Sequence, residues 1–147
     1  CAQAAARHPM TVHGQGGQTR GYINIRDTVR CIELAITNPP EAGEYRVFNQ
    51  FTEQWSVNQL AKLVQKTAAE LCLEAQIDHI ENPRVELEKH YFNAAHTRLL
   101  ELGLVPNLLQ GKILKELMQA ALDNEDRIDQ SVIAPTVNWR SSVNWVR

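Results

Sequence analysis

The sequence has no excess of positive charge and no long hydrophobic run. Its 147 residues include 15 Lys and Arg against 17 Asp and Glu, which gives a formal net charge of −2. A nucleic-acid-binding protein needs a basic face, so this balance supports no nucleic-acid partner. The apolar stretches are too short to span a bilayer, so no membrane partner is expected either. The 44% hydrophobic and 22% charged residues are typical of a globular domain with its own core.

Patterns typical of catalytic and metal sites are also scarce. The three cysteines, Cys1, Cys31 and Cys72, have no short paired spacing, so we expect free thiols rather than disulfides or a zinc site. The sequence contains no Tyr-x-x-x-Lys and no serine nucleophile elbow. The acidic stretch between His79 and His90 fits no standard zinc spacing and is expected to be a solvated face. We therefore predict no catalytic residue and no metal in this chain.

The pattern of apolar residues predicts a mixed α/β fold. The pattern indicates three or four helices, from segments at residues 26–37, 57–71, 93–102 and 109–121, and the alanine-rich residues 1–7 are expected to be the end of a helix. Period-two and β-branched content indicates three extended segments, at residues 10–13, 45–49 and 76–80. Asp27, at the start of a helix, is expected to cap it or to anchor the preceding loop. We expect residues 1–129 to form one binding portion and residues 130–147 an irregular tail.

The glycine-rich residues 14–21 are the first candidate site. Glycines let backbone amides approach a ligand closely, and Arg20 beside them could bind a phosphate through two hydrogen bonds. The alternative is a flexible turn with a solvated arginine, which spacing alone favours because short glycine motifs are common by chance. The segment is not a dinucleotide fingerprint, since no strand and helix frame it in the required order.

The second candidate site is Asn82-Pro83-Arg84. Proline stiffens the approach to Arg84, and the amide of Asn82 offers both donors and an acceptor. Such an arginine suits an anion. The alternative, a surface arginine paired with a neighbouring glutamate, is favoured when this segment is considered alone.

Several segments together resemble the extended short-chain dehydrogenase/reductases. Residues 9–14 and 18–27 resemble the substrate-side loop of that family, which has Pro-x-x-Val-Tyr-Gly followed by Gln-Thr-Arg and an Asp. Residues 47–49 with 56–60 match its strand and the following Ser-Val-x-x-Leu helix. Arg84 occupies the position of the family's second arginine, ahead of a short helix ending in Leu-Gly. The resemblance covers nearly the whole chain.

Three further stretches, residues 46–54, 82–86 and 133–139, are similar to the UDP-sulfoquinovose synthase branch of this NAD-dependent epimerase/dehydratase family. The resemblance implies an α/β fold: the C-terminal, substrate-binding part of the extended dehydrogenase fold with the edge of its Rossmann sheet. The family's glycine fingerprint and its catalytic Tyr and Lys would precede Cys1. We therefore expect a fragment that is inactive by itself.

The branch makes UDP-sulfoquinovose, for sulfolipid biosynthesis, from UDP-glucose and sulfite with NAD bound by the N-terminal half. The resemblance implies homodimers of the full-length enzyme, located in the bacterial cytoplasm or the plastid stroma. His13 stands where the family usually has Tyr. Alternatives are half of another NAD-dependent UDP-sugar epimerase or decarboxylase, or a non-catalytic nucleotide-binding or interaction module. The residues that the resemblance assigns to UDP are Thr11, Val12, His13, Gly14, Gln18, Thr19, Arg20, Asn82, Pro83 and Arg84.

Overall fold

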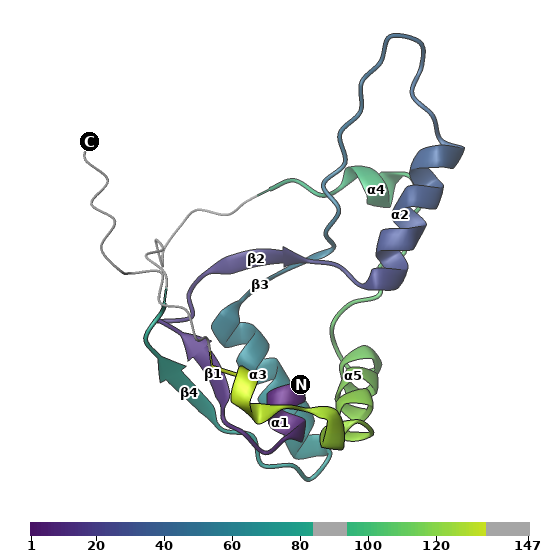
Figure 1. The fold of residues 1–147 in the computed structure, drawn as a ribbon. Coiled ribbons are helices and arrows are strands. Elements are labelled where there is room, and N and C mark those ends of the chain that lie inside the picture. The colour runs from purple at the N-terminus through teal and green to yellow at the C-terminus, as the bar shows by residue number, and fades with distance from the viewer. Residues whose placement is uncertain (84–93, 135–147) are drawn as a thin grey trace, which may run out of the picture.

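The computed structural model describes residues 1–83 and 94–134, which form a mixed α/β fold with two small sheets (Figure 1). The helices are α1 (Ala2–Ala5), α2 (Ile25–Thr37), α3 (Val57–Glu70), α4 (Arg98–Glu101) and α5 (Lys112–Leu122). The strands are β1 (Met10–His13), β2 (Thr19–Tyr22), β3 (Glu53–Ser56) and β4 (Ile77–Ile80). Two short 3-10 turns, Glu125–Arg127 and Gln130–Val132, follow α5. None of the helices in these described ranges is long and apolar enough to cross a membrane.

The first of two hydrophobic cores lies where α1, α3 and α5 meet the parallel strands β1 and β4. The strands pair in the register Met10↔Ile77 and His13↔Ile80. The core contains small and flexible side chains, which let these elements approach closely. Its buried members are Ala4, Met10, Ala68, Ala75 and Met118.

The start of α3 beside this core is fixed by a capping box. The Ser56 side chain accepts a hydrogen bond from the backbone N–H of Gln59 at 3.2 Å, and the Gln59 side chain accepts one from the N–H of Ser56 at 2.8 Å. Two backbone donors that the helix itself cannot pair are thereby satisfied. This confirms the prediction of a helix beginning after Ser56.

The second core joins α2 to α4 and to the chain after it. Cys31 and Leu34 of α2 pack against Leu99 and Leu104. Gly103, with φ of 93°, turns the chain after α4 in the left-handed conformation that glycine adopts without strain. The predicted end of this short helix is confirmed, although the helix begins only at Arg98. Asn93, the predicted cap, lies outside the described residues.

An antiparallel ribbon of β2 and β3 lies between the two cores (Figure 1). The sequence did not predict either strand, because each is four residues long and poor in β-branched side chains. The strand predicted at residues 45–49 is wrong, since this segment has no strand pairing. Tyr45 is 88% exposed and Val47 54% exposed. β-Branched and aromatic content favours a strand only where a neighbouring strand and a packed face exist, and this segment lacks both.

Two carboxylates attach the ribbon and α2 to the loop before α5. Asp27, only 1% exposed, accepts the backbone N–H of Asn107 at 2.7 Å and its side-chain Nδ2 at 2.5 Å. Glu53 Oε1 accepts the N–H of Leu109 at 2.5 Å. Asp27 was expected to cap α2 or to anchor the preceding loop. The cap is instead Asn24, because its side chain reaches the N–H of Arg26, and Asp27 holds a distant loop.

Candidate functional site

The predicted site residues gather at the carboxyl ends of β1 and β4. The N–H of Gly14 donates to the carbonyl of Ile80 at 2.9 Å, which continues the ladder one step beyond the strands. Because the strands are parallel, the chain leaves both from the same edge of the sheet. The edge formed by the carboxyl ends of parallel strands is where ligands of α/β folds bind. Asn82 and Pro83 therefore lie on the same side as His13 and Gly14, whereas Arg84 lies outside the described residues.

The glycine-rich loop of residues 14–18 requires glycine for two reasons. Gly14 and Gly16 have φ values of 64° and 67°, in the region where a side chain is strained. A Cβ on Gly16 would also lie 2.6 Å from Cγ1 of Val12 and closer still to the side chain of Asn58. The loop is thus packed tightly against β1 and α3 rather than extended into solvent.

The carbonyl groups of this loop accept hydrogen bonds from α3 and β4. Asn58 binds two of them, through Nδ2 to Gln15 at 2.7 Å and through its backbone N–H to Gly16 at 3.0 Å. His79 Nδ1 contacts the carbonyl of Gly14 at 2.9 Å, a hydrogen bond in the tautomer that carries the proton on Nδ1. The N–H of Val57 donates to the carbonyl of Gln18 at 3.3 Å.

Sequence reasoning did not identify Asn58 or His79 as part of the site. Their partners are 43 and 65 residues away in the chain, so no local spacing indicates these contacts.

Among residues 1–83 and 94–134, two buried polar atoms at the site have no hydrogen-bond partner: Nδ1 of His13 and Oε1 of Gln18. Gln18 is only 5% exposed, and Asn82 is similarly buried at 6%. A buried polar group without a partner costs about 1–3 kcal/mol, so such groups are uncommon unless they have a role. The two atoms are suited to a ligand that supplies polar groups of its own.

The other predicted site residues differ in which of their groups could contact a ligand. Val12 is 1% exposed within the fold, so only its backbone could contact a ligand. The Thr11 hydroxyl accepts a hydrogen bond from Nε2 of Gln3 in α1 at 2.8 Å and can still donate one. Thr19 opens β2 at half-buried exposure and pairs with Ser56.

Arg20 supplies the positive charge of the site. It is exposed on β2, two residues from Tyr22, and residues at this spacing share one face of a strand. Burial raises the pKa of the Tyr22 hydroxyl, and the charge of Arg20 partly opposes that rise. A guanidinium beside a phenol and a glycine loop can bind a phosphate with charge-assisted hydrogen bonds.

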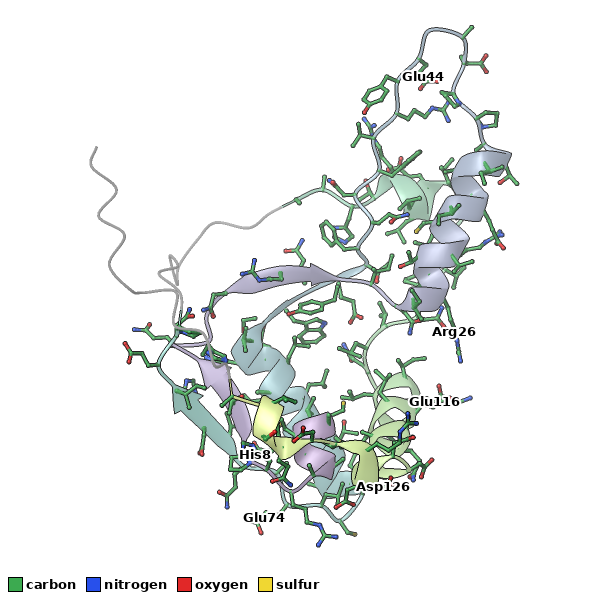
Figure 2. The ribbon with its side chains drawn as sticks, in the orientation of Figure 1. His8, Arg26, Glu44, Glu74, Glu116 and Asp126 are labelled. Atoms are coloured by element: carbon green, nitrogen blue, oxygen red, sulfur yellow. The ribbon has the colours of Figure 1, made fainter. Side chains whose placement is uncertain are left out.

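A cavity of 510 Å³ lies at the other end of the sheet, lined by Arg7, His8, Cys72 and Glu74 among others. Of these residues, His8 and Glu74 are labelled in Figure 2. It is next to the amino ends of β1 and β4, away from the glycine loop. Neither His13 nor Gln18 lines it. Among the described residues no cluster of three or more His, Cys, Asp or Glu could hold a metal ion, and the three cysteines are free thiols.

Comparison with known proteins connects this chain to one enzyme family, although no protein-family model matches it. It is 55% identical over 140 residues to a chloroplastic UDP-sulfoquinovose synthase of Spinacia oleracea, covering 95% of this chain and 29% of the relative. It is 41% identical over 142 residues to a UDP-sulfoquinovose synthase of Sulfolobus acidocaldarius, covering 95% of this chain and 36% of the relative. The chain therefore spans about a third of the length of these curated relatives.

Solved structures show the same fold. A UDP-glucuronic acid 4-epimerase from Bacillus cereus, in complex with UDP-glucuronic acid and NAD, aligns with a TM-score of 0.59 at 22% identity. The alignment covers 86% of this chain and 38% of the epimerase. A mutant of that epimerase, bound to a fluorinated UDP-sugar and NAD, aligns equally well at 21% identity. By sequence, the chain is therefore similar to one part of UDP-sulfoquinovose synthases, and by fold it is similar to one part of a UDP-glucuronic acid 4-epimerase.

Proposed function

We propose that the chain is the C-terminal, UDP-sugar-binding part of a UDP-sulfoquinovose synthase, an enzyme that converts UDP-glucose and sulfite with the help of NAD. The observation that carries the proposal is the pair of buried polar atoms on His13 and Gln18 that have no partner among the described residues, with the exposed Arg20 two residues after Gln18 in the chain. They lie at the carboxyl ends of a parallel strand pair, in a chain 55% identical to such a synthase.

The residues of this chain would bind and orient the nucleotide rather than carry out chemistry. Arg20 and Arg84 would hold the pyrophosphate, each through charge-assisted hydrogen bonds of about 1.5–3 kcal/mol. The polar groups of Thr11, His13, Gln18 and Asn82 would contact the remaining UDP atoms. Binding energy far from the reacting carbon can orient a sugar for a reaction elsewhere in the enzyme.

NAD, which supplies hydride transfer when bound, does not fit the glycine loop of this chain. A dinucleotide pyrophosphate binds where a strand leads into a helix N-terminus, and this loop instead leads from β1 into another strand, β2. The first N–H groups of α3, at Val57 and Asn58, already donate to loop carbonyls. We therefore assign NAD to the rest of the synthase and derive no step of the reaction through it.

The same proposal extends to partners and location. Sulfite would be the second substrate, and the full-length enzyme would be a homodimer. The relative of Spinacia oleracea is described as chloroplastic, which supports the plastid stroma for a photosynthetic source. The bacterial cytoplasm is the other location that the proposal allows.

Without the catalytic Tyr and Lys of the family, the 147-residue chain should not turn over UDP-glucose. Incubation of the purified chain with UDP-glucose, sulfite and NAD, followed by chromatography of the nucleotide sugars, checks this expectation. Formation of UDP-sulfoquinovose would contradict it.

A calorimetric titration of the chain with UDP tests the binding role. Arg20→Lys and Arg84→Lys should each weaken binding by roughly tenfold, because an ammonium cannot reproduce the two-pronged contact of a guanidinium. Arg26→Lys is the matched control, since Arg26 is an exposed arginine in the first turn of α2 (Figure 2). The proposal fails if the wild-type chain, shown to be folded by circular dichroism, does not bind UDP.

A further inference from the structure

Asn58 makes three contacts with the glycine loop of residues 14–18. Its Nδ2 donates to Gln15, its backbone N–H donates to Gly16, and its side chain occupies the space where a Cβ on Gly16 would lie. These contacts join the first turn of α3 to a segment more than 40 residues away in the sequence. Asn58 as a residue is half-buried, whereas its hydrogen bond to Gln15 is exposed to solvent, so the contacts act together rather than through one shielded bond.

The loop depends on the contacts from Asn58 because its glycine-rich sequence gives its backbone little rigidity. Gly14, Gly16 and Gly17 have more backbone freedom than any other residue type, and fixing one residue costs roughly 1–2 kcal/mol of conformational entropy. The N–H of Gly14 bonds to the carbonyl of Ile80 at the start of the loop. The middle of the loop is held by Asn58. The next residues along the chain are Gln18, Thr19 and Arg20, so a shift of the loop would move all three.

The first turn of α3, which carries Asn58, is itself rigid. Asn58 is the second residue of α3 and lies between Ser56 and Gln59, the two residues that form the capping box. The backbone N–H groups of Val57 and Asn58, which the helix cannot pair internally, donate to the loop. This end of the helix therefore serves to orient the loop and is not itself open to an anion.

We infer that Asn58 is a positioning residue of the nucleotide site: it touches no ligand, and it sets the affinity for UDP by holding the loop from which Gln18 and Arg20 extend. This inference rests on the proposed function. An amide is needed at this position because Nδ2 must donate to a carbonyl. A carboxylate would face the Gln15 carbonyl with a second acceptor, and an alkyl group would leave that carbonyl without this donor.

The test compares two alanine variants of α3 that each lose one amide-to-carbonyl hydrogen bond. Asn58→Ala loses the 2.7 Å bond to Gln15, and Gln65→Ala loses the 2.8 Å bond from Gln65 Nε2 to the carbonyl of Ala75. Gln65 is on the same helix, and its partner precedes β4, at the opposite end of the sheet from the loop. UDP affinity is measured by calorimetry, and amide hydrogen exchange of residues 14–20 is measured without ligand.

Asn58→Ala should weaken UDP binding by roughly three- to tenfold and speed exchange in the loop, because the binding-competent loop is less populated. Gln65→Ala should leave affinity within about twofold of wild type while lowering the melting temperature similarly. Equal UDP affinity in wild type and Asn58→Ala overturns the inference and leaves the proposed function standing. If wild type binds no UDP, the proposed function fails. Amide hydrogen exchange of the loop then tests the inference, because an unchanged exchange rate in Asn58→Ala overturns it as well. If exchange is instead faster in Asn58→Ala, only the structural part of the inference stands, that Asn58 holds the loop, and its role in UDP affinity is overturned.

Discussion

Arg7 and Cys72 adopt the left-handed backbone conformation, with φ of 54° and 58°. Each follows the C-cap residue of a helix, Ala6 after α1 and Leu71 after α3, and so stands at the position where glycine usually ends a helix. After α3, the N–H of Cys72 bonds to the carbonyl of Ala69 and the N–H of Leu73 to that of Ala68, at 3.1 and 2.9 Å. These hydrogen bonds hold Cys72 in a conformation that costs a side-chain-bearing residue roughly 1–2 kcal/mol.

Cys72→Gly should therefore stabilise the chain. Relief of the strain is partly offset by the greater backbone freedom of glycine in the unfolded chain, which leaves a gain of about 0.5–1 kcal/mol. Urea unfolding followed by circular dichroism measures the change. Gly103→Ala is the control in the opposite direction, because it puts a side chain on a residue in the left-handed conformation. A Cβ at Gly103 meets nothing within 4 Å, so a loss of about 1 kcal/mol in the free energy of unfolding would arise from the backbone alone. A stability loss in Cys72→Gly would contradict the argument.

Glu44, at the tip of the exposed loop beyond α2, is bound by Arg46 (Figure 2). The hydrogen bonds from Arg46, at 2.7 Å to both carboxylate oxygens, together with one from the backbone N–H of Glu41, lower the pKa of Glu44 from 4.5 to about 2. A carboxyl whose pKa is lower in the folded state contributes stability above its unfolded pKa. The contribution of this pair is therefore lost as the pH falls from 4.5 toward 2.

Carbon-detected NMR titration of the Glu44 carboxyl should show a midpoint near 2 in the wild-type chain. In Arg46→Gln the midpoint should return toward the ordinary range of a glutamate, because the first cause of the shift is removed. A midpoint that stays near 2 in this variant would show that Arg46 is not responsible.

At the scale of elements, the amphipathic helices α2, α3 and α5 could be predicted because their apolar residues recur at helical spacing. The β2–β3 ribbon could not, since short strands with few β-branched residues carry little local signal. The strand predicted at residues 45–49 had the composition of a strand but no neighbour to pair with.

The residues of the candidate site also fall into those that the sequence predicted and those that it did not. The residues that the sequence indicated form two local segments, from Thr11 to Arg20 and from Asn82 to Arg84. Asn58 and His79, which hold the loop, come from elements far away in the sequence and are brought there only by the packing of α3 and β4. Pairing across such distances depends on tertiary structure, so a local motif identifies the loop but not the residues that fix it.

The hydrogen bonds between Asp27 and Asn107 join α2 to the loop before α5. Two variants measure how much they contribute to stability. Asp27→Ala leaves the partly buried N–H of Asn107 without its partner, so we expect a loss of about 2 kcal/mol. Asn107→Ala keeps the backbone N–H bonded to Asp27 and should cost only about 1 kcal/mol. Thermal unfolding of both variants measures the difference, and equal losses would mean that the backbone bond contributes nothing.

At the scale of the whole molecule, α2 has two apolar faces. One packs in the second core through Cys31 and Leu34. On the other, Ile25 is 74% exposed, Val29 54%, Ile32 52% and Ile36 73%. These four residues recur at intervals of four, three and four, so they form one continuous apolar stripe along the helix. Exposed apolar surface of this kind lowers solubility, especially in salts that are excluded from protein surfaces.

Ile36→Lys should therefore raise the ammonium sulfate concentration at which half of the chain precipitates. Val132→Lys is the matched control, because Val132 is 72% exposed but stands apart from the stripe. We expect the control to shift precipitation less, and circular dichroism should be unchanged in both variants. Equal shifts would mean that the stripe behaves as separate exposed residues.

The first hydrophobic core has a consequence for how the chain is made. It combines Ala4 and Met10 with Ala68 and Ala75, and it is completed only by Met118 of α5. A ribosome adds roughly 5–20 residues per second, so the first helix and strand wait on the order of ten seconds for their last packing partner to be synthesised. During that interval the early segments present apolar surface, and a nascent chain stalled before α5 would be a natural target for chaperones.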